Sequence, residues 1–131
     1  MQSATYARST TSFLVLAAVL ALAACSGQKK AEQLKAATES VARIQDGVVD
    51  YATNQKTWPK HIDELKVGGD EMPGVSYVVG EGGVVVVYFA DGSALPGAHL
   101  VYTPTQDQNG GVTWACASQG LDAASKPAGC T

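Results

Sequence analysis

Residues 113–131 read TWACASQGLDAASKPAGCT and hold two cysteines, Cys116 and Cys130. The segment between them is small and polar, with a single leucine and no helical or strand periodicity. The separation is far wider than a CxxC spacing, and no histidine is near in the sequence, so a redox pair and a two-cysteine metal site are the weaker alternatives. In an exported protein the pattern favours a disulfide that fastens the end of the chain to a strand-like run.

The sequence before Cys116 is rich in β-branched and aromatic residues, and turn signals divide it into short runs. Gly80-Glu81-Gly82-Gly83 separates the first two runs, and Asn109-Gly110 precedes the last. Even spacing of this kind predicts an antiparallel meander. The predicted strands cover residues 75–79, 84–89, 99–103 and 112–116.

Upstream of the strands, residues 31–54 predict one long amphipathic helix, because apolar residues recur at alternating spacings of 3 and 4. Glu39 and Arg43 stand at positions i and i+4 and predict an ion pair on the solvent side. Trp58-Pro59 ends the helix, since the residue before a proline avoids the helical conformation. The apolar stripe consists of Leu34, Ala37, Val41, Ile44, Val48 and Tyr51.

A helix with one apolar stripe, followed by four strands, predicts an α+β fold. The long N-terminal amphipathic helix is expected to pack on one face of a four-stranded antiparallel sheet. A C-terminal disulfide loop would then close the chain. Trp58 and Trp114 are expected to be packing anchors of this domain.

The beginning of the chain predicts export. An unbroken apolar run extends from Phe13 to Ala24, which is shorter than the about 20 residues of a membrane-spanning helix and suits a secretory signal. The run ends in Leu22-Ala23-Ala24-Cys25, which resembles the lipobox of bacterial lipoproteins. In such proteins the signal is cut before the cysteine, which is then acylated. An ordinary signal peptide with a coincidental cysteine and a short uncleaved anchor are the alternatives.

The expected organisation is a lipoprotein signal peptide over residues 1–24, a lipidated tether over residues 25–30, and one domain over residues 31–131. Acylation of Cys25 would make the membrane a partner and leave the other two cysteines as an even pair. Their bond, closing a loop of roughly 15 residues, is worth about 3 kcal/mol. Ser26 after the cysteine, rather than aspartate, favours the outer over the inner membrane of the bacterial envelope.

Charge and motifs argue against several classes of function. A formal net charge of −3 leaves no basic face for a nucleic acid. There is no G-x-S-x-G nucleophile motif, and Gly80–Gly83 lacks the Lys-Ser/Thr of a phosphate loop. His61 and His99 are isolated, and the acidic pairs 63–64 and 70–71 lack an alternating calcium-ligand pattern, so they are expected at the solvated surface. We therefore expect no enzyme, no cofactor and no metal site.

From residue 31 to residue 131 these features together resemble the globular part of a type IV pilin. The most specific piece is the ending Trp114-x-Cys116 followed by Pro-x-x-Cys130. The long helix, its Thr-Trp-Pro exit and the four strands agree with it. The resemblance implies that the two cysteines form the C-terminal disulfide and that residues 117–129 form an exposed, variable loop.

One departure from the pilin pattern matters for function. A pilin carries a prepilin-peptidase site, Gly followed by Phe-Thr-Leu-(Ile/Val)-Glu, before a long apolar helical half that packs the filament core. Here Phe13 follows a serine, and no acidic residue occurs before Glu32. We therefore expect a lipid-anchored, non-enzymatic envelope protein that assists a type IV pilus, type II secretion-type machinery or adhesion, with pilin or pilus-machine proteins as candidate partners. The alternative is a pilus-independent structural or ligand-binding lipoprotein with the same fold.

Overall fold

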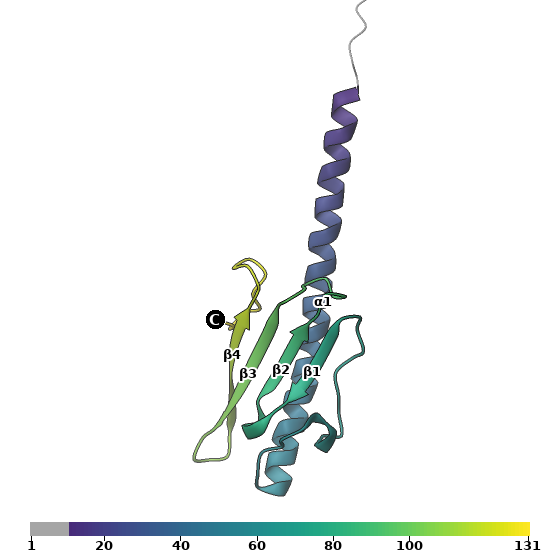
Figure 1. Ribbon diagram of the computed structural model, residues 1–131. Helices are drawn as coiled ribbons and strands as arrows, with labels where there is room; N and C mark the ends of the chain where they lie inside the picture. Colours follow the sequence, from purple (N-terminus) through teal and green to yellow (C-terminus); the bar gives the residue numbers. More distant parts are fainter. Residues whose placement is uncertain (1–10) are drawn as a thin grey trace, which may run out of the picture.

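The computed structural model describes residues 11–131, with side chains from Cys25 onwards, as one long helix beside a four-stranded sheet (Figure 1). The first ten residues of the predicted signal peptide lie outside this description. Two short 3-10 turns, η1 (Ile62–Glu64) and η2 (Glu81–Gly83), lie in the connections. The main elements are α1 (Thr11–Gln55), β1 (Val75–Val79), β2 (Val85–Phe89), β3 (His99–Gln106) and β4 (Val112–Gln119).

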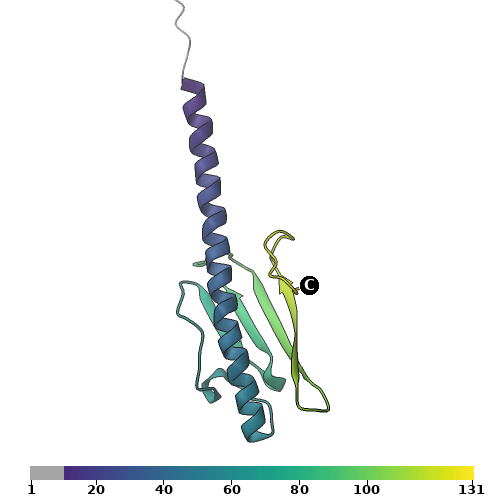
Figure 2. The same ribbon diagram turned by 180° about the vertical axis from the view of Figure 1, so that it is seen from behind.

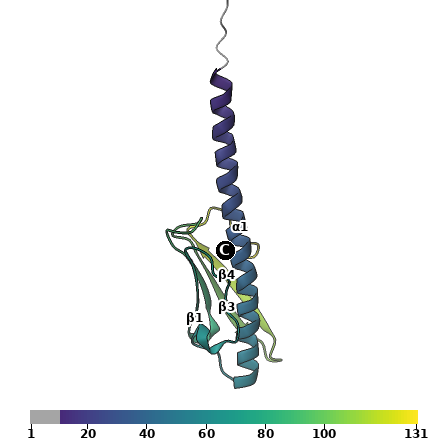
Figure 3. The ribbon, with the colours of Figure 1, turned by 90° about the vertical axis from the view of Figure 1, so that its right-hand side faces the viewer.

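The four strands form the predicted antiparallel meander, in the order β1-β2-β3-β4. The helix crosses one face of this sheet and extends beyond it at one end (Figures 2 and 3). β3 runs further than predicted, through Pro104, which lies opposite Trp114. Pairing between β2 and β3 stops at Tyr102, so β3 has a free edge at Pro104, where a residue without an amide hydrogen is tolerated.

The apolar stripe of α1 is the helical half of the core, as its spacing predicts. Ala37, Val41, Ile44 and Val48 are at most 1% exposed. Near the end of the sheet where α1 protrudes, Ala37 and Val41 pack with Val87, Phe89, Leu95 and Leu100. At the other end, Ile44 and Val48 pack with Val79 and Val85. Burial at about 25 cal/mol per Å² of apolar surface makes this contact the main source of stability of the domain. Among the residues whose side chains the structure describes, the buried apolar ones are Ala37, Val41, Ile44, Val48, Pro59, Val79, Val85, Val87, Phe89, Leu95, Ala98 and Leu100.

The helix begins at Thr11, not at residue 31, where its apolar stripe predicts a start. Residues 11–30 contain no proline and many alanines and leucines, which favour helix. An apolar stripe indicates only where a helix is covered, so it cannot reveal a helical segment without a partner. The expected tether at residues 25–30 is accordingly helical, and its residues are all exposed.

The predicted ion pair between Glu39 and Arg43 is wrong. The Arg43 guanidinium instead lies 2.7 Å from the Asp70 carboxylate, and Glu39 lies 3.9 Å from Lys35. The hydroxyl of Ser40, which is fully buried, accepts hydrogen bonds from Arg43 Nη2 at 3.2 Å and from the Asp70 amide at 3.0 Å. These contacts fasten the loop before β1 to α1. Asp70 is about 30 positions from its partners, so an i,i+4 spacing rule cannot predict the contact.

The two tryptophans pack against the end of the core formed by Ile44 and Val85, as the sequence analysis expects. The glycine turn between β1 and β2 fits closely under Trp58. Gly83 has a φ of +74°, and a Cβ there would lie 2.7 Å from Trp58 Cε3. Only glycine satisfies both the backbone conformation and the close approach at this position.

Candidate functional site at the disulfide loop

Cys116 and Cys130 form a disulfide between β4 and the end of the chain, with Cα atoms 4.4 Å apart. The backbone continues this contact as a short parallel bridge. The Thr131 amide donates to the Cys116 carbonyl at 3.0 Å, and the Ser118 amide donates to the Thr131 carbonyl at 2.8 Å. The C-terminus thus covers part of the outer edge of β4, where unpaired backbone groups would otherwise face solvent.

The enclosed segment, residues 117–129, is organised by its own turns; we call it the disulfide loop. The Ser125 amide donates to the Asp122 carboxylate at 2.8 Å and to the Asp122 carbonyl at 3.1 Å. Hydrogen bonds to the Asp122 carboxylate from the Ser125 side chain and, second, from the Ser125 amide hold the pKa of Asp122 below its usual value, with a smaller contribution from the charge of Lys30. The Cys130 amide donates to the Pro127 carbonyl at 3.1 Å. The loop therefore presents a defined surface.

The loop is seated on the connection between β2 and β3 at a glycine that the sequence analysis did not single out. Gly120 has a φ of +73°, and a Cβ on it would lie 2.9 Å from both the Gly97 carbonyl oxygen and Ala98 Cα. These neighbours are backbone atoms, which cannot move aside as a flexible side chain would. Leu121, which follows, packs on the core.

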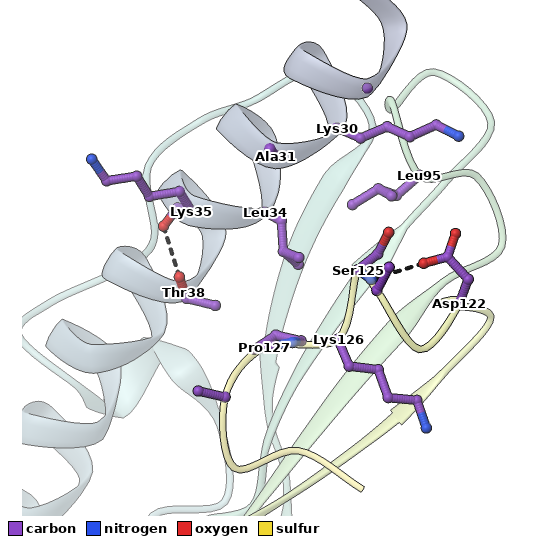
Figure 4. A pocket seen from close by; sticks show the side chains of 13 residues that line it. Lys30, Ala31, Leu34, Lys35, Thr38, Leu95, Asp122, Ser125, Lys126 and Pro127 are labelled. Carbon is purple, nitrogen blue, oxygen red and sulfur yellow. Dashed lines mark hydrogen bonds between the residues drawn. The ribbon is translucent and has the colours of Figure 1, made fainter. Parts of the chain in front are cut away.

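A groove of about 670 Å³ separates the disulfide loop from α1; we call it the loop–helix groove (Figure 4). Its walls are the face of α1 between Gly27 and Thr38, Leu95 from the connection before β3, and residues 122–128. The disulfide loop lies at the end of the sheet where α1 protrudes (Figure 1), and the groove that it lines is therefore at that end. The groove brings together the exposed part of α1 and the disulfide loop, which are far apart in the sequence.

The structure brings two of the predicted site residues together and leaves the third apart. Cys25 is a free, exposed cysteine on α1, just before Gly27 at the start of the loop–helix groove. Its predicted acylation stays a prediction. Within the part of the chain that the structure describes, no helix has an apolar stretch long enough to cross a membrane.

The remaining chemical candidates have local protein partners. Glu64 accepts hydrogen bonds from the backbone amides of Lys60 at 2.6 Å and His61 at 3.0 Å, and these bonds hold the pKa of its carboxyl below the usual value. The His99 ring lies 6.0 Å from the ring of Tyr88. Among the described residues, no group of three or more His, Cys, Asp and Glu side chains is arranged to hold a metal ion.

Comparison with known proteins gives one result. A family model described as Pilin (bacterial filament) matches residues 17–131, which include the helix, the sheet and the disulfide loop. No curated protein matches the sequence. The family match also includes part of the apolar run that precedes Cys25.

Proposed function

This chain belongs to the pilin family, and on that premise we propose that it is a lipid-anchored accessory protein of a type IV pilus or type II secretion-type machine. The family is structural and non-enzymatic, and it is associated with the cell envelope. The accessory protein would present the folded pilin face, with the disulfide loop, to pilus components or to an adhesion target. It would not form the body of a filament.

The observation that carries this proposal is the junction at Cys25. Small residues lead from the apolar run directly into the cysteine, in the order Leu-Ala-Ala-Cys. The segment after it, residues 25–32, is exposed along its whole length and includes Lys29 and Lys30. A filament core needs apolar helix at this position, and an exposed charged helix supplies no apolar area to bury.

A second candidate is a filament subunit that retains its apolar segment. Two observations favour it: α1 continues without a break from Thr11 through Cys25, and the family match begins at residue 17. In that case residues 13–24 would serve as the anchor, and the thiol of Cys25 would be unmodified. The two candidates differ in where the mature chain begins and in the chemistry of one sulfur atom.

Metabolic labelling with an alkyne-tagged palmitate tests the anchor. The wild-type protein should incorporate the label, and Cys25→Ala should not, because the acylated atom is gone; cleavage at this site should stop as well, so the variant should keep residues 13–24. The matched control is Cys116→Ala with Cys130→Ala, which removes the two disulfide-bonded cysteines and should keep the label. Label on Cys25→Ala, or none on wild type, would contradict the lipid anchor.

The accessory role is tested on cells that make pili. Crosslinking of the wild-type protein should recover pilus components. Exchange of residues 122–128 for a Gly/Ser segment of equal length should weaken that recovery, while β4, Gly120, Leu121 and the two cysteines keep the fold. Electron microscopy with an antibody to this protein should show no continuous labelling along filaments. Filaments built from this protein as the main subunit would establish the second candidate instead.

A further inference from the structure

The loop–helix groove carries a concentration of positive charge in a protein whose formal net charge is −3. Lys30, Lys35 and Lys126 line it, against the single carboxylate of Asp122. Asp122 already accepts a hydrogen bond from the Ser125 amide at 2.8 Å. Two positive charges are therefore uncompensated within the lining itself, a surplus that attracts an anion.

The lysines are available for a ligand. The Lys35 ammonium lies 3.9 Å from the Glu39 carboxylate, and both side chains are more than half exposed, at 77% and 61%. An exposed pair of this length contributes little and is readily exchanged for a better partner. Lys30 and Lys126 lie on opposite walls, one on α1 and the other on the disulfide loop (Figure 4). In Figure 4 the Lys35 and Lys126 side chains point away from the space between helix and loop, so they would have to turn inward to meet one anionic group, which their long, flexible stems allow.

The floor of the groove is apolar. Leu34 projects from α1, Pro127 belongs to the disulfide loop, and Leu95, only 7% exposed, comes from the connection before β3 (Figure 4). An inorganic anion gains nothing from such a floor. A molecule with an anionic head and the beginning of a hydrocarbon chain gains from both parts, since each buried methylene contributes about 0.8 kcal/mol.

The groove also lies where such molecules are concentrated, a point that rests on the proposed membrane anchor. Lys30 follows Cys25 by five positions, about 7.5 Å along a helix that rises 1.5 Å per residue. The headgroup layer of a bilayer is about 5–7 Å thick on each side of the hydrocarbon core. An anchor at Cys25 would thus hold Lys30 at the level of the lipid phosphates, and Lys35, about 15 Å from Cys25 along the helix, would reach down to them from above.

We propose that the loop–helix groove binds the headgroup of an anionic phospholipid, with Lys30, Lys35 and Lys126 around the phosphate. The apolar floor contacts the glycerol and the first methylenes of the lipid. This contact joins the disulfide loop to the membrane surface and fixes the orientation of the sheet relative to it. The groove is then a lipid site as well as a part of the pilin fold.

Titration of the full chain, held in a neutral detergent, with dihexanoyl phosphatidylglycerol tests the site directly. Backbone amide NMR shifts should move saturably at residues 27–38 and 122–128. Dihexanoyl phosphatidylcholine has the same acyl chains and no net charge, and its affinity should be lower by at least about tenfold. Each lysine near an anionic lipid raises the affinity by about a factor of five. Equal binding of the two lipids would overturn the proposal, and binding of sodium phosphate as tight as that of the anionic lipid would overturn its lipid part.

Two triple variants with the same change in charge locate the site. Lys30→Gln with Lys35→Gln and Lys126→Gln should lower the affinity for the anionic lipid by about tenfold or more. Lys56→Gln with Lys60→Gln and Lys66→Gln, beyond the other end of α1, should change it less than about twofold. An equal loss of affinity in both variants would mean that the lipid responds to the net charge of the protein and not to the groove, and would overturn the proposal. The comparison of the two lipids uses the wild-type chain, so it tests the preference for the anionic lipid even if a variant fails to fold.

Failure of this inference and failure of the proposed anchor give different results. A Cys25 thiol that carries no acyl chain in cells would end the anchor, yet the short-chain lipids reach the groove in either case. Acylated protein that does not distinguish phosphatidylglycerol from phosphatidylcholine would end the lipid site and leave the anchor intact.

Discussion

Two stretches of one helix behave in opposite ways. Between Ala37 and Val48, the residues of α1 that face the sheet are almost completely buried, whereas residues 25–32 of the same helix are exposed. The backbone is the same in both; the side chains differ, apolar at every third or fourth position in one and Gln, Lys and Glu in the other. The buried stretch holds the domain together, and the exposed stretch presents its surface to the surroundings. Long helices without tertiary contacts are marginal in water, so a partner for the exposed stretch would also stabilise it.

The contrast is sharpest in a pair of alanine substitutions on α1. Ile44→Ala removes a fully buried side chain and should lower the free energy of unfolding by about 2–5 kcal/mol, through lost burial and a residual cavity. Gln28→Ala in the exposed stretch should change it by less than about 0.5 kcal/mol. Denaturant unfolding of the full chain in a mild detergent measures both. Comparable losses would mean that the exposed stretch also packs against the domain.

Removal of the disulfide tests the far end of the chain in the same way. Cys116→Ser with Cys130→Ser should lower the free energy of unfolding by about 2–4 kcal/mol, because the unfolded chain regains the freedom that the closed loop denies it. Cys25→Ser, a change at the exposed cysteine of α1, should leave it unchanged. The same denaturant titrations decide. A double variant as stable as wild type would contradict the stapling role of the bond.

Two glycines of the disulfide loop separate backbone strain from close packing. Gly120 and Gly129 both have a positive φ, of +73° and +81°, but a Cβ would meet nearby backbone only at Gly120. Both substitutions to alanine carry the cost of a left-handed conformation, about 1 kcal/mol, and Gly120→Ala adds the clash with Ala98, for a total of about 2–3 kcal/mol. Thermal unfolding should therefore show a clearly lower Tm for Gly120→Ala. Equal values of Tm would mean that the loop is not seated on Ala98 in solution.

The smallest expected effect concerns the link between the loop before β1 and the buried part of α1. The hydrogen bond from Arg43, aided by its charge, lowers the pKa of Asp70 below its ordinary value of 3.8. Ionised Asp70 therefore stabilises the folded state above about pH 4, and this contribution is lost as the pH falls through the lowered folded-state pKa. Asp70→Asn should reduce the Tm slightly near neutral pH, and the difference from wild type should shrink below about pH 3. A Tm difference between Asp70→Asn and wild type that grows as the pH falls would mean that ionised Asp70 does not stabilise the folded state.

The sequence predicts the fold wherever a periodic pattern coincides with a contact. The stripe from Leu34 to Val48 identifies the covered face of α1, and runs of β-branched and aromatic residues divided by turn signals identify the four strands. The disulfide that the cysteine pattern favours is present, and the family match agrees with the resemblance to pilins. These predictions succeed because the side chains that define the pattern are the ones that pack.

The sequence does not predict contacts between distant segments, nor the part of a helix that extends beyond the sheet. The Arg43 pair with Asp70 depends on where the loop before β1 crosses α1, which no local spacing contains. Gly120 is required because of Ala98, a neighbour from another connection. The loop–helix groove combines Lys30 and Lys126, and only the folded chain places them on the same cavity.

The central claim, that the exposed stretch of α1 begins the mature protein and carries a lipid, is tested most directly by intact-mass spectrometry of the protein purified from its own membranes. The account predicts a mature chain that starts at Cys25, with the mass of residues 25–131 increased by two or three fatty acyl chains and a glycerol unit, because one chain alone anchors weakly. A mature chain that keeps residues 13–24 and has an unmodified Cys25 thiol would contradict it and make the apolar half of α1 the anchor.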